Sequence, residues 1–564
     1  MIKTLLFAVL MIQTGLAFAQ TQSLGKPLGI PLQLSGSFCE LRSNHFHAGL
    51  DFRTQGVEGH PLKAVRDGYV ARITVSPWGY GNAVYINHPS DSITTVYGHI
   101  QRFNDIITDI VKKRQYEMES FSVDVRLDSN AMPVKQGDIF AYSGNTGSSG
   151  GPHLHFEIRD SRTGDYLDPL PFYRNLIHDS RKPELQGLII YPMNDTSMVN
   201  GSSSPLMIGK TSQITASAWG EISFGIRAVD RMNGTNFSFG IKQLSVKVDS
   251  LDVFLYHSDR FSYDESDMLN SCIDYPLWID KRQFYFKTFI EPGNTLRSVL
   301  SRNGGKIRID KEREYKILIQ ITDLYGNTTV LPIIINGIQG EADISKSHTA
   351  KVLRWYEENV FEAEGIRLIL PFNRLYTNVI TDYDTIAGVS GIAGVSGEEL
   401  VSKIHLITKK PIPLHLNGQL TIKADMLPDS LASFAGIVRI NLYNKKVSWI
   451  GGKYNNDSIT ANISELGAYA IAVDTVKPKI TPVEPSLWQS RKQITVKIKD
   501  DFSGIGSFRG EINGKYVLFE YDPKNAKLYY IFDNKRLTPG YHRLMLTVTD
   551  NAGNTAEFRH TFLY

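Results

Sequence analysis

The chain has 564 residues, of which 21% are charged and 42% are hydrophobic, an ordinary globular composition. At about 150 residues per domain, this length predicts roughly four domains. The formal net charge is only +3 and there are two cysteines, so the sequence gives no electrostatic case for a nucleic-acid partner and excludes a disulfide-stabilised scaffold. The 27 Tyr, 27 Phe and 46 Gly residues are typical of a β-rich chain with many turns.

Residues 1–19 have the pattern of a secretory signal peptide. One basic residue, Lys3, precedes an apolar stretch that ends in Ala17-Phe18-Ala19, an A-x-A cleavage site. Gln13-Thr14-Gly15 interrupts the stretch, which is therefore short for a membrane span of about 20 residues. We expect an exported chain that begins at Gln20 and has no stable membrane insertion after the signal is removed. The periplasm is the preferred location, with the cell surface or secretion as alternatives.

Turn signals and short β-type runs divide the remainder into four regions. The expected fold class is mainly β: an antiparallel β-sheet domain, which holds the histidine-rich motifs, followed by Ig-like β-sandwich modules. The expected bounds are residues 20–181 for the first domain, 182–341 and 342–474 for two β-sandwiches, and 475–564 for an Ig-like β-sandwich.

A weak internal repeat links the second and fourth regions. Asp323-Leu324-Tyr325-Gly326-Asn327-Thr328 and Asp550-Asn551-Ala552-Gly553-Asn554-Thr555 share the pattern D-x-x-G-N-T, and each follows a strand-like run. Asp and Asn bond their own backbone and Gly tolerates positive φ, so the pattern predicts a hairpin turn in two related modules. Calcium or sugar binding by these carboxylates is the alternative. The sequence disfavours it because no acidic cluster surrounds either turn at the spacing of a calcium loop.

Three histidine motifs in the first region carry the chemistry. They are His47-Ala48-Gly49-Leu50-Asp51, Tyr97-Gly98-His99 and Gly151-Pro152-His153-Leu154-His155-Phe156-Glu157. In a strand His153 and His155 project from one face, and His47 and Asp51 do the same if their segment is extended. Three imidazole or carboxylate ligands with one open position make the usual catalytic zinc site. Four histidines and one aspartate are enough for such a metal site and for proton transfer beside it.

The ordered combination of motifs is far more specific than any one of them. Between about Gly36 and Asp160 the chain contains HFHAGLDF, AVRDGYV, YGN, YGHI, VKQGD and SGNTGSSGGPHLHFE in that order. This stretch resembles the lysostaphin/LytM-type zinc metallopeptidases, the glycylglycine-endopeptidase family that cuts bacterial cell-wall peptidoglycan. The resemblance implies a small, mostly antiparallel β core with a groove across one face.

The resemblance also implies the roles of individual residues. His47, Asp51 and His155 correspond to the family's three metal ligands, with one Zn²⁺ per chain. His99 and His153 correspond to its two catalytic histidines, one acting as the general base and the other as a hydrogen-bond donor to the oxyanion. The sequence does not say which histidine has which role.

The implied function is that of an exported zinc metalloendopeptidase that hydrolyses peptide bonds in peptidoglycan stems or cross-links during cell-wall remodelling. The alternative is a non-catalytic envelope scaffold that binds peptidoglycan or regulates another wall hydrolase. Proteolysis of glycine-rich proteins is a third hypothesis. Peptidoglycan is the expected partner, and the C-terminal β modules are candidates for binding other envelope proteins or for positioning the enzyme.

Three features of the first region leave alternatives open. The segment of residues 100–133 is longer than the corresponding segment in the compact family pattern, and its sequence suggests a helix near 105–116 followed by a strand. This segment either forms a wall of the groove or is a surface elaboration. Glu157 shares the parity of His153 and His155, so it either orients a ligand or is merely structural. Cys39 is expected as a buried thiol, with pairing to Cys272 or metal ligation as alternatives.

Overall fold

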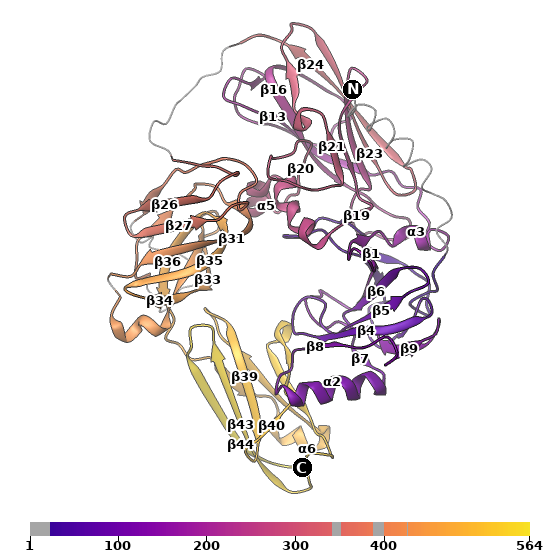
Figure 1. Ribbon diagram of the computed structural model, residues 1–564, viewed down its shortest axis with the longest axis vertical. Coiled ribbons are helices and arrows are strands. Elements are labelled where there is room, and N and C mark those ends of the chain that lie inside the picture. Colours follow the sequence, from indigo (N-terminus) through magenta and orange to yellow (C-terminus); the bar gives the residue numbers. More distant parts are fainter. Residues whose placement is uncertain (1–22, 341–350, 387–399, 426) are drawn as a thin grey trace. The chain divides into compact units, whose positions relative to one another are not determined.

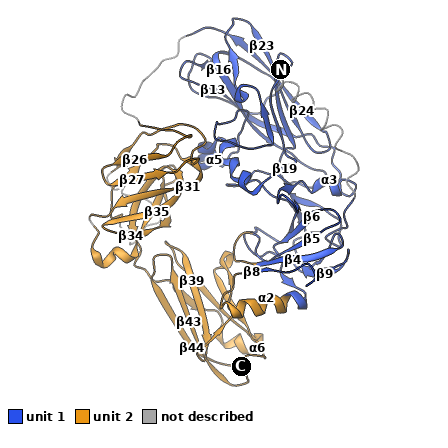
Figure 2. Ribbon diagram, in the orientation of Figure 1, with its two compact units in different colours: residues 1–74, 80–107, 125–346 blue, residues 75–79, 108–124, 347–564 orange. Residues whose placement is uncertain are grey.

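The computed structural model describes residues 23–340, 351–386, 400–425 and 427–564. The predicted signal peptide and the boundary at 341/342 lie outside these residues. The described chain consists mostly of strands in antiparallel sheets (Figure 1), so the expected mainly β fold class is confirmed. Two compact units are present: residues 1–74, 80–107 and 125–346 form one, and residues 75–79, 108–124 and 347–564 form the other (Figure 2).

The histidine motifs lie in the first region of the chain, which contains twelve strands and two helices among its described residues. Its elements are β1 (Leu34–Gly36), β2 (Leu50–Arg53), β3 (Pro61–Lys63), β4 (Gly68–Val75), β5 (Ala83–His88), β6 (Ile93–Gly98), β7 (Arg102–Phe103), α2 (Asp105–Glu117), β8 (Val123–Arg126), β9 (Pro133–Val134), β10 (Ile139–Tyr142), β11 (His153–Asp160), β12 (Tyr166–Leu167) and α3 (Leu170–Tyr173). The main sheet has the order β1-β2-β11-β6-β5-β4-β8, which places β11 between β2 and β6.

The two faces of β11 explain how the sheet supports a site. Leu154, Phe156 and Ile158 alternate along the strand and are fully buried. The Phe156 ring contacts the rings of Phe52 and Tyr97 in the core. The intervening residues of the strand therefore project from the opposite face, as the period of two requires.

Residues 100–133 contain a helix and a strand, as their sequence suggested. The helix α2 begins after Asn104, whose side-chain oxygen accepts a hydrogen bond from the Ile107 N–H at 3.0 Å. Asp105 lies in its first turn and Arg114 in its last turn, charges that favour a helix by interaction with its dipole.

The next region is built around one long strand. Its elements are β13 (Glu184–Pro192), β14 (Met198–Val199), β15 (Leu206–Ile208), β16 (Ile214–Val229), β17 (Gln243–Val248), β18 (Leu251–His257), β19 (Arg260–Phe261), α4 (Leu269–Cys272), α5 (Tyr275–Lys281), β20 (Phe286–Lys287), β21 (Val299–Ser301), β22 (Ile307–Ile309), β23 (Glu314–Thr322) and β24 (Thr328–Gly337). The first half of β16 pairs in parallel with β24 and its second half pairs with β13. The parallel pair departs from the antiparallel sheets of an Ig-like β-sandwich, the kind of module expected here.

The region from residue 351 contains two five-stranded sheets. Its elements are β25 (Val352–Leu353), β26 (Asn359–Ala363), β27 (Ile366–Leu370), β28 (Val379–Ile380), β29 (Asp384–Ile386), β30 (Ile404–Leu406), β31 (Ile412–Lys423), β32 (Ala435–Asn441), β33 (Lys446–Gly451), β34 (Lys453–Asn455), β35 (Ser458–Leu466) and β36 (Ala468–Val473). The sheet orders are β26-β27-β31-β35-β34 and β29-β30-β36-β32-β33. One apolar cluster contains buried residues of both sheets, among them Leu420 and Ile471.

The last region has two four-stranded sheets. Its elements are β37 (Lys479–Pro482), α6 (Trp488–Arg491), β38 (Gln493–Lys499), β39 (Ile505–Ile512), β40 (Lys515–Val517), β41 (Glu520–Asp522), β42 (Lys527–Ile531), β43 (Tyr541–Asp550) and β44 (Thr555–Leu563). The orders are β37-β38-β42-β41 and β40-β39-β43-β44. Val496 and Leu546, one from each sheet, belong to one buried cluster, which is the core of a β-sandwich.

The two D-x-x-G-N-T segments form the predicted turns. In each, the first Asp N–H donates to the Asn carbonyl oxygen, and the Asn N–H donates to the Asp carboxylate. The turns join β23 to β24 and β43 to β44. The Asn side chain also donates to the same carboxylate in both turns.

Both cysteines are buried free thiols. The structure thus agrees with the default expectation for Cys39. Burial raises the pKa of the Cys39 thiol and raises that of Cys272 to about 11. These values disfavour thiolate chemistry at either position.

Candidate active site

His155 and Asp51 are placed opposite each other by strand register. Residue 155 of β11 pairs with residue 51 of β2, so the two side chains lie on one face of the sheet. The Nδ1 atom of His155 lies 3.0 Å from Oδ1 of Asp51. Both side chains are almost fully buried, with residue exposures of 5% and 7%.

His47 reaches the same place from a loop rather than from an extended strand. The chain enters β2 only at Leu50, and a Cβ on Gly49 would lie 2.2 Å from the Phe156 carbonyl oxygen. Glycine is therefore required for this close approach. The Nε2 atom of His47 lies 3.0 Å from Asp51 Oδ1 and 3.1 Å from His155 Nδ1.

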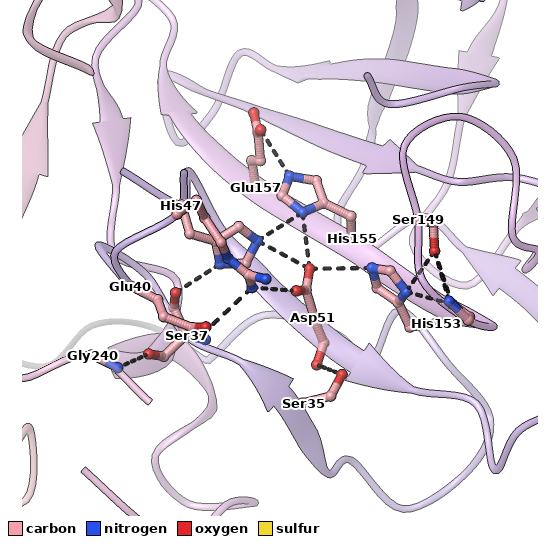
Figure 3. Close-up of polar contacts among 12 residues, drawn as sticks. Ser35, Ser37, Glu40, His47, Asp51, Ser149, His153, His155, Glu157 and Gly240 are labelled. Atoms are coloured by element: carbon pink, nitrogen blue, oxygen red, sulfur yellow. Dashed lines mark hydrogen bonds and ion pairs between the residues drawn. The ribbon is translucent and has the colours of Figure 1, made fainter. Parts of the chain in front are cut away.

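The remaining ring nitrogens of the two histidines have partners that orient the rings (Figure 3). His47 Nδ1 donates to the Ser37 carbonyl oxygen at 2.7 Å. His155 Nε2 lies 2.9 Å from Glu157 Oε1, and Arg159 binds the other oxygen of Glu157. Glu157 is fully buried, so the structure favours the orienting role over a solvent-facing carboxylate. In metal sites such contacts fix the tautomer and the ring direction.

The loop that carries His47 is held at several points. The Cys39 N–H donates to the His47 carbonyl oxygen and the His47 N–H donates to the Glu40 carbonyl oxygen. The Gly240 N–H donates to Ser37 Oγ at 3.0 Å. The region that follows the histidine motifs in sequence thus contacts the segment that positions His47 (Figure 3).

Charge coupling among the three side chains is strong. Burial alone would lower the pKa of His155, but contacts with Asp51 and Glu157 raise it to about 9. Burial would raise the pKa of Asp51, but His47 and hydrogen bonds from His153 and His155 hold it well below its usual range. In the metal-free protein at neutral pH, His155 therefore carries a proton that a metal ion has to displace.

The three ligand atoms fit a divalent transition metal. His47 Nε2, Asp51 Oδ1 and His155 Nδ1 lie 3.0–3.1 Å from one another, and this trio forms a group able to hold a metal ion. Tetrahedral zinc with bonds of about 2.0–2.1 Å needs ligand atoms about 3.3 Å apart. Two imidazoles and one carboxylate are donors that suit such a metal.

His99 and His153 lie beside this trio. Their rings are 4.7 Å apart between centroids. His153 Nε2 is 3.4 Å from Asp51 Oδ1, and its Nδ1 donates to the Gly151 carbonyl oxygen at 2.8 Å. His99 Nδ1 donates to the Thr146 carbonyl oxygen at 2.7 Å. In both rings this leaves Nε2 as the atom that exchanges a proton.

Burial, with smaller effects from His153 and His155, lowers the pKa of His99 to about 3. His99 is therefore neutral at physiological pH. The residue also has a left-handed backbone, with φ of +58°. A non-glycine residue in this region costs energy and is often found at functional sites.

Two residues that contact the trio were given no role from the sequence, although Tyr80 belongs to the YGN motif. The Tyr80 ring stacks on His155 with centroids 5.1 Å apart. Arg42 Nη2 donates to Asp51 Oδ2 at 3.0 Å and also lies near Glu40. These residues come from loops whose approach to the site is set by tertiary structure. Arg159 was predictable, because it continues the alternation of His153, His155 and Glu157.

Comparisons with known proteins relate part of the first region to a peptidase family. Residues 45–117 match the model of Peptidase family M23. The DD-carboxypeptidase/endopeptidase Mpg of Neisseria meningitidis is 29% identical over 119 residues, which cover 21% of each chain.

This chain contains a LytM-type peptidase domain.

Two further relatives of the LytM-type domain are lysostaphin of Staphylococcus simulans and an uncharacterised metalloprotease of Haemophilus influenzae. The first is 28% identical over 131 residues, 23% of this chain and 22% of that protein. The second is 33% identical over 124 residues, 22% of this chain and 20% of that protein. The chain thus spans about a fifth of the length of these three relatives.

Beyond the LytM-type domain, residues 350–474 match the model of a Zu5-like domain. This match falls within the β-sandwich expected at 342–474. The domain bounds otherwise stay predictions. None of the helices in the described ranges has the length and apolar character needed to cross a membrane.

Proposed function

We propose that the protein is an exported zinc metalloendopeptidase that hydrolyses peptide bonds in peptidoglycan. The observation that carries the proposal is the trio of His47, Asp51 and His155 with two further imidazoles beside it. Relatives named as lysostaphin and as a carboxypeptidase/endopeptidase support the peptide-cleaving chemistry. The signal-like residues 1–19 support export, with the periplasm as the proposed compartment.

His47, Asp51 and His155 would hold the metal through Nε2, Oδ1 and Nδ1. Zinc bound there would act as a Lewis acid that polarises a peptide carbonyl and lowers the pKa of water, so that a nucleophile is available near neutral pH. Glu157 holds the His155 ring in the orientation that presents Nδ1. The Ser37 carbonyl does the same for Nε2 of His47.

The proton transfers fall to His99 and His153. Each ring keeps its Nδ1 hydrogen on a backbone carbonyl, so Nε2 is the atom that receives a proton. One of the two takes the proton of the attacking water and passes it to the leaving amine. The other, protonated at Nε2, donates a hydrogen bond to the oxyanion. His99 is buried and His153 is partly buried, which limits competition from bulk water.

The test is digestion of intact peptidoglycan sacculi by the purified full-length protein. Zinc-loaded protein, metal-free protein and the His153→Ala variant are incubated in parallel, and released fragments are identified by chromatography and mass spectrometry. The proposal predicts fragments only from the zinc-loaded wild type. Zinc-loaded protein that binds sacculi without releasing fragments would instead support the envelope-scaffold function.

A further inference from the structure

Three aspartate carboxylates lie together where the linker after α3 enters the next region. We call Asp179, Asp230 and Asp323 the linker cluster; one oxygen from each lies within 4.8 Å of the others. Asp179 belongs to the linker, five residues before β13. Asp230 directly follows β16, and Asp323 directly follows β23 as the first residue of its D-x-x-G-N-T turn. The acidic cluster that the sequence failed to show is therefore assembled from three distant segments.

The chain itself fixes two of these carboxylates. Asp323 accepts hydrogen bonds from the backbone and side-chain nitrogens of Asn327 at 2.8 and 2.7 Å. Asp179 accepts from the N–H groups of Arg181 and Asn233 at 3.2 and 3.0 Å through Oδ1. Their positions do not depend on long, mobile side chains.

Two oxygens of the linker cluster have no hydrogen-bonding partner in the described chain: Oδ1 of Asp230 and Oδ2 of Asp179. Asp230 is only 6% exposed. A buried carboxylate oxygen without a partner is costly and rare in native proteins. Burial is the main reason that the pKa of Asp230 is raised to about 7, and repulsion from Asp323 and Asp179 adds to the shift.

Among the residues that the structure describes, no basic side chain forms an ion pair with the linker cluster. Arg181 and Arg231 are the nearest arginines in sequence, and both form ion pairs with Glu184, at 3.5 and 3.4 Å. These two arginines therefore do not supply an ion-pair partner to the cluster.

We propose that Asp179, Asp230 and Asp323 form a calcium site that fastens the linker to the region that follows it. A ligand set made only of carboxylates, which are hard oxygen donors, suits Ca²⁺ better than the transition metals that favour imidazoles. Calcium accepts six to eight oxygens in irregular geometry, so waters complete a site with three protein carboxylates. Magnesium demands a smaller, nearly octahedral site, which three carboxylates from separate segments do not favour.

The other repeat provides an internal comparison. Asp474, Asp500 and Asp550, which we call the C-terminal cluster, also lie within 4.8 Å of one another. Here Asp474 accepts from the N–H groups of Val476 and Ser503 through its two oxygens, and the described chain leaves no buried oxygen of these three residues unpaired. This cluster therefore has no feature that calls for a cation, and it supplies the control variant.

The experiment adds calcium chloride to the full-length protein after removal of divalent metals with a chelator. Binding is measured by titration calorimetry and the melting temperature is recorded in parallel. Trypsin cleavage after Arg181 reports on the linker, since this residue lies two positions from Asp179. Calcium is expected to raise the melting temperature by a few degrees and to slow this cleavage.

Asp230→Asn is the informative variant. It removes one charge and is expected to weaken calcium binding by at least about tenfold, because a ligand is lost. The calcium-free variant should be at least as stable as the calcium-free wild type, since a buried repulsive charge has been removed. The Asp500→Asn control should keep the full calcium response.

Three results would overturn the proposal. They are the absence of a calcium response in the wild type, an unchanged response in Asp230→Asn, and loss of the response in Asp500→Asn alone. An equal response to magnesium at the same concentration would contradict the choice of calcium. The peptidase site does not interfere, because two of its three donors are imidazoles, which calcium avoids.

Discussion

The peptidase trio and the linker cluster both gather three ligand atoms from separate segments, but their chemistry differs. In the trio, His47 and His155 each use the second ring nitrogen for a hydrogen bond that orients the first. In the linker cluster, Asp230 and Asp179 each leave one buried oxygen without a partner. The comparison shows how donor type selects the cation: two imidazoles and one carboxylate suit zinc, and three carboxylates suit calcium.

The largest effect is expected from removing a ligand of the trio. Asp51→Ala should abolish metal binding and lower the rate of sacculus digestion by at least about 10³-fold, because several kcal/mol of transition-state stabilisation are lost. His45→Ala is the matched control, since His45 is exposed and contacts Asn44. If the Asp51→Ala protein digests sacculi at the same rate as the control variant, Asp51 is not a metal ligand of the active site.

Loss of an imidazole outside the trio should separate metal binding from activity. His99→Ala is expected to keep its metal and to lose about 10²–10⁴-fold in rate, the range of general acid–base catalysis. Metal content by atomic spectroscopy and digestion rate are measured on the same sample. Full activity in this variant would leave His99 without a role in proton transfer or oxyanion binding.

A smaller effect is expected from the residue that orients His155. Glu157→Gln keeps the size of the side chain but removes its charge, so metal affinity should fall about 10–100-fold. Glu58→Gln changes an exposed carboxylate and should have no effect. If Glu157→Gln leaves the affinity unchanged, the contact at 2.9 Å is structural only.

The smallest effect concerns the pH dependence of stability at the linker cluster. Burial, Asp323 and Asp179 raise the pKa of Asp230 from its ordinary value of 3.8 to about 7, and a backbone hydrogen bond from Arg231 and the charge of Arg181 oppose the shift. For an acid with a raised pKa, the stabilisation is complete below the unfolded pKa and disappears as pH rises through the folded pKa. Calcium-free wild type should therefore lose stability relative to Asp230→Asn between about pH 4 and 7.

This prediction is measured as the difference in melting temperature between the two proteins across that pH range. Calcium should reduce the difference at pH 7, because the cation compensates the charge that the proton no longer neutralises. A difference that does not change with pH would show that Asp230 remains ionised throughout.

The sequence predicted those parts of the molecule that depend on short-range periodicity. Alternation along β11 placed His153, His155 and Glu157 on one face, and the D-x-x-G-N-T pattern predicted both hairpin turns. The resemblance to LytM-type peptidases assigned His47 and Asp51, although His47 approaches from a loop and not from an extended strand. That approach depends on Gly49 and on contacts with Ser37 and Glu40, which no local pattern reveals.

The linker cluster shows why sites assembled from distant segments could not be predicted from the sequence. Asp179, Asp230 and Asp323 are separated by dozens of residues, and only the ends of β16 and β23 bring them together. A calcium loop is recognised by acidic residues at fixed, short spacings in the sequence. Such a pattern does not reveal a site whose residues are brought together by the topology of the sheet. The parallel pairing of β16 with β24 was hidden for the same reason.

The most direct test of the central claim is the zinc content of the purified full-length protein, measured together with its action on sacculi. One zinc per chain is predicted for the wild type and for His153→Ala, and none for His155→Ala, with fragments released by the wild type alone. Stoichiometric zinc in His155→Ala, or fragments from His153→Ala equal to those of the wild type, would contradict the assignment of ligand and proton-transfer roles.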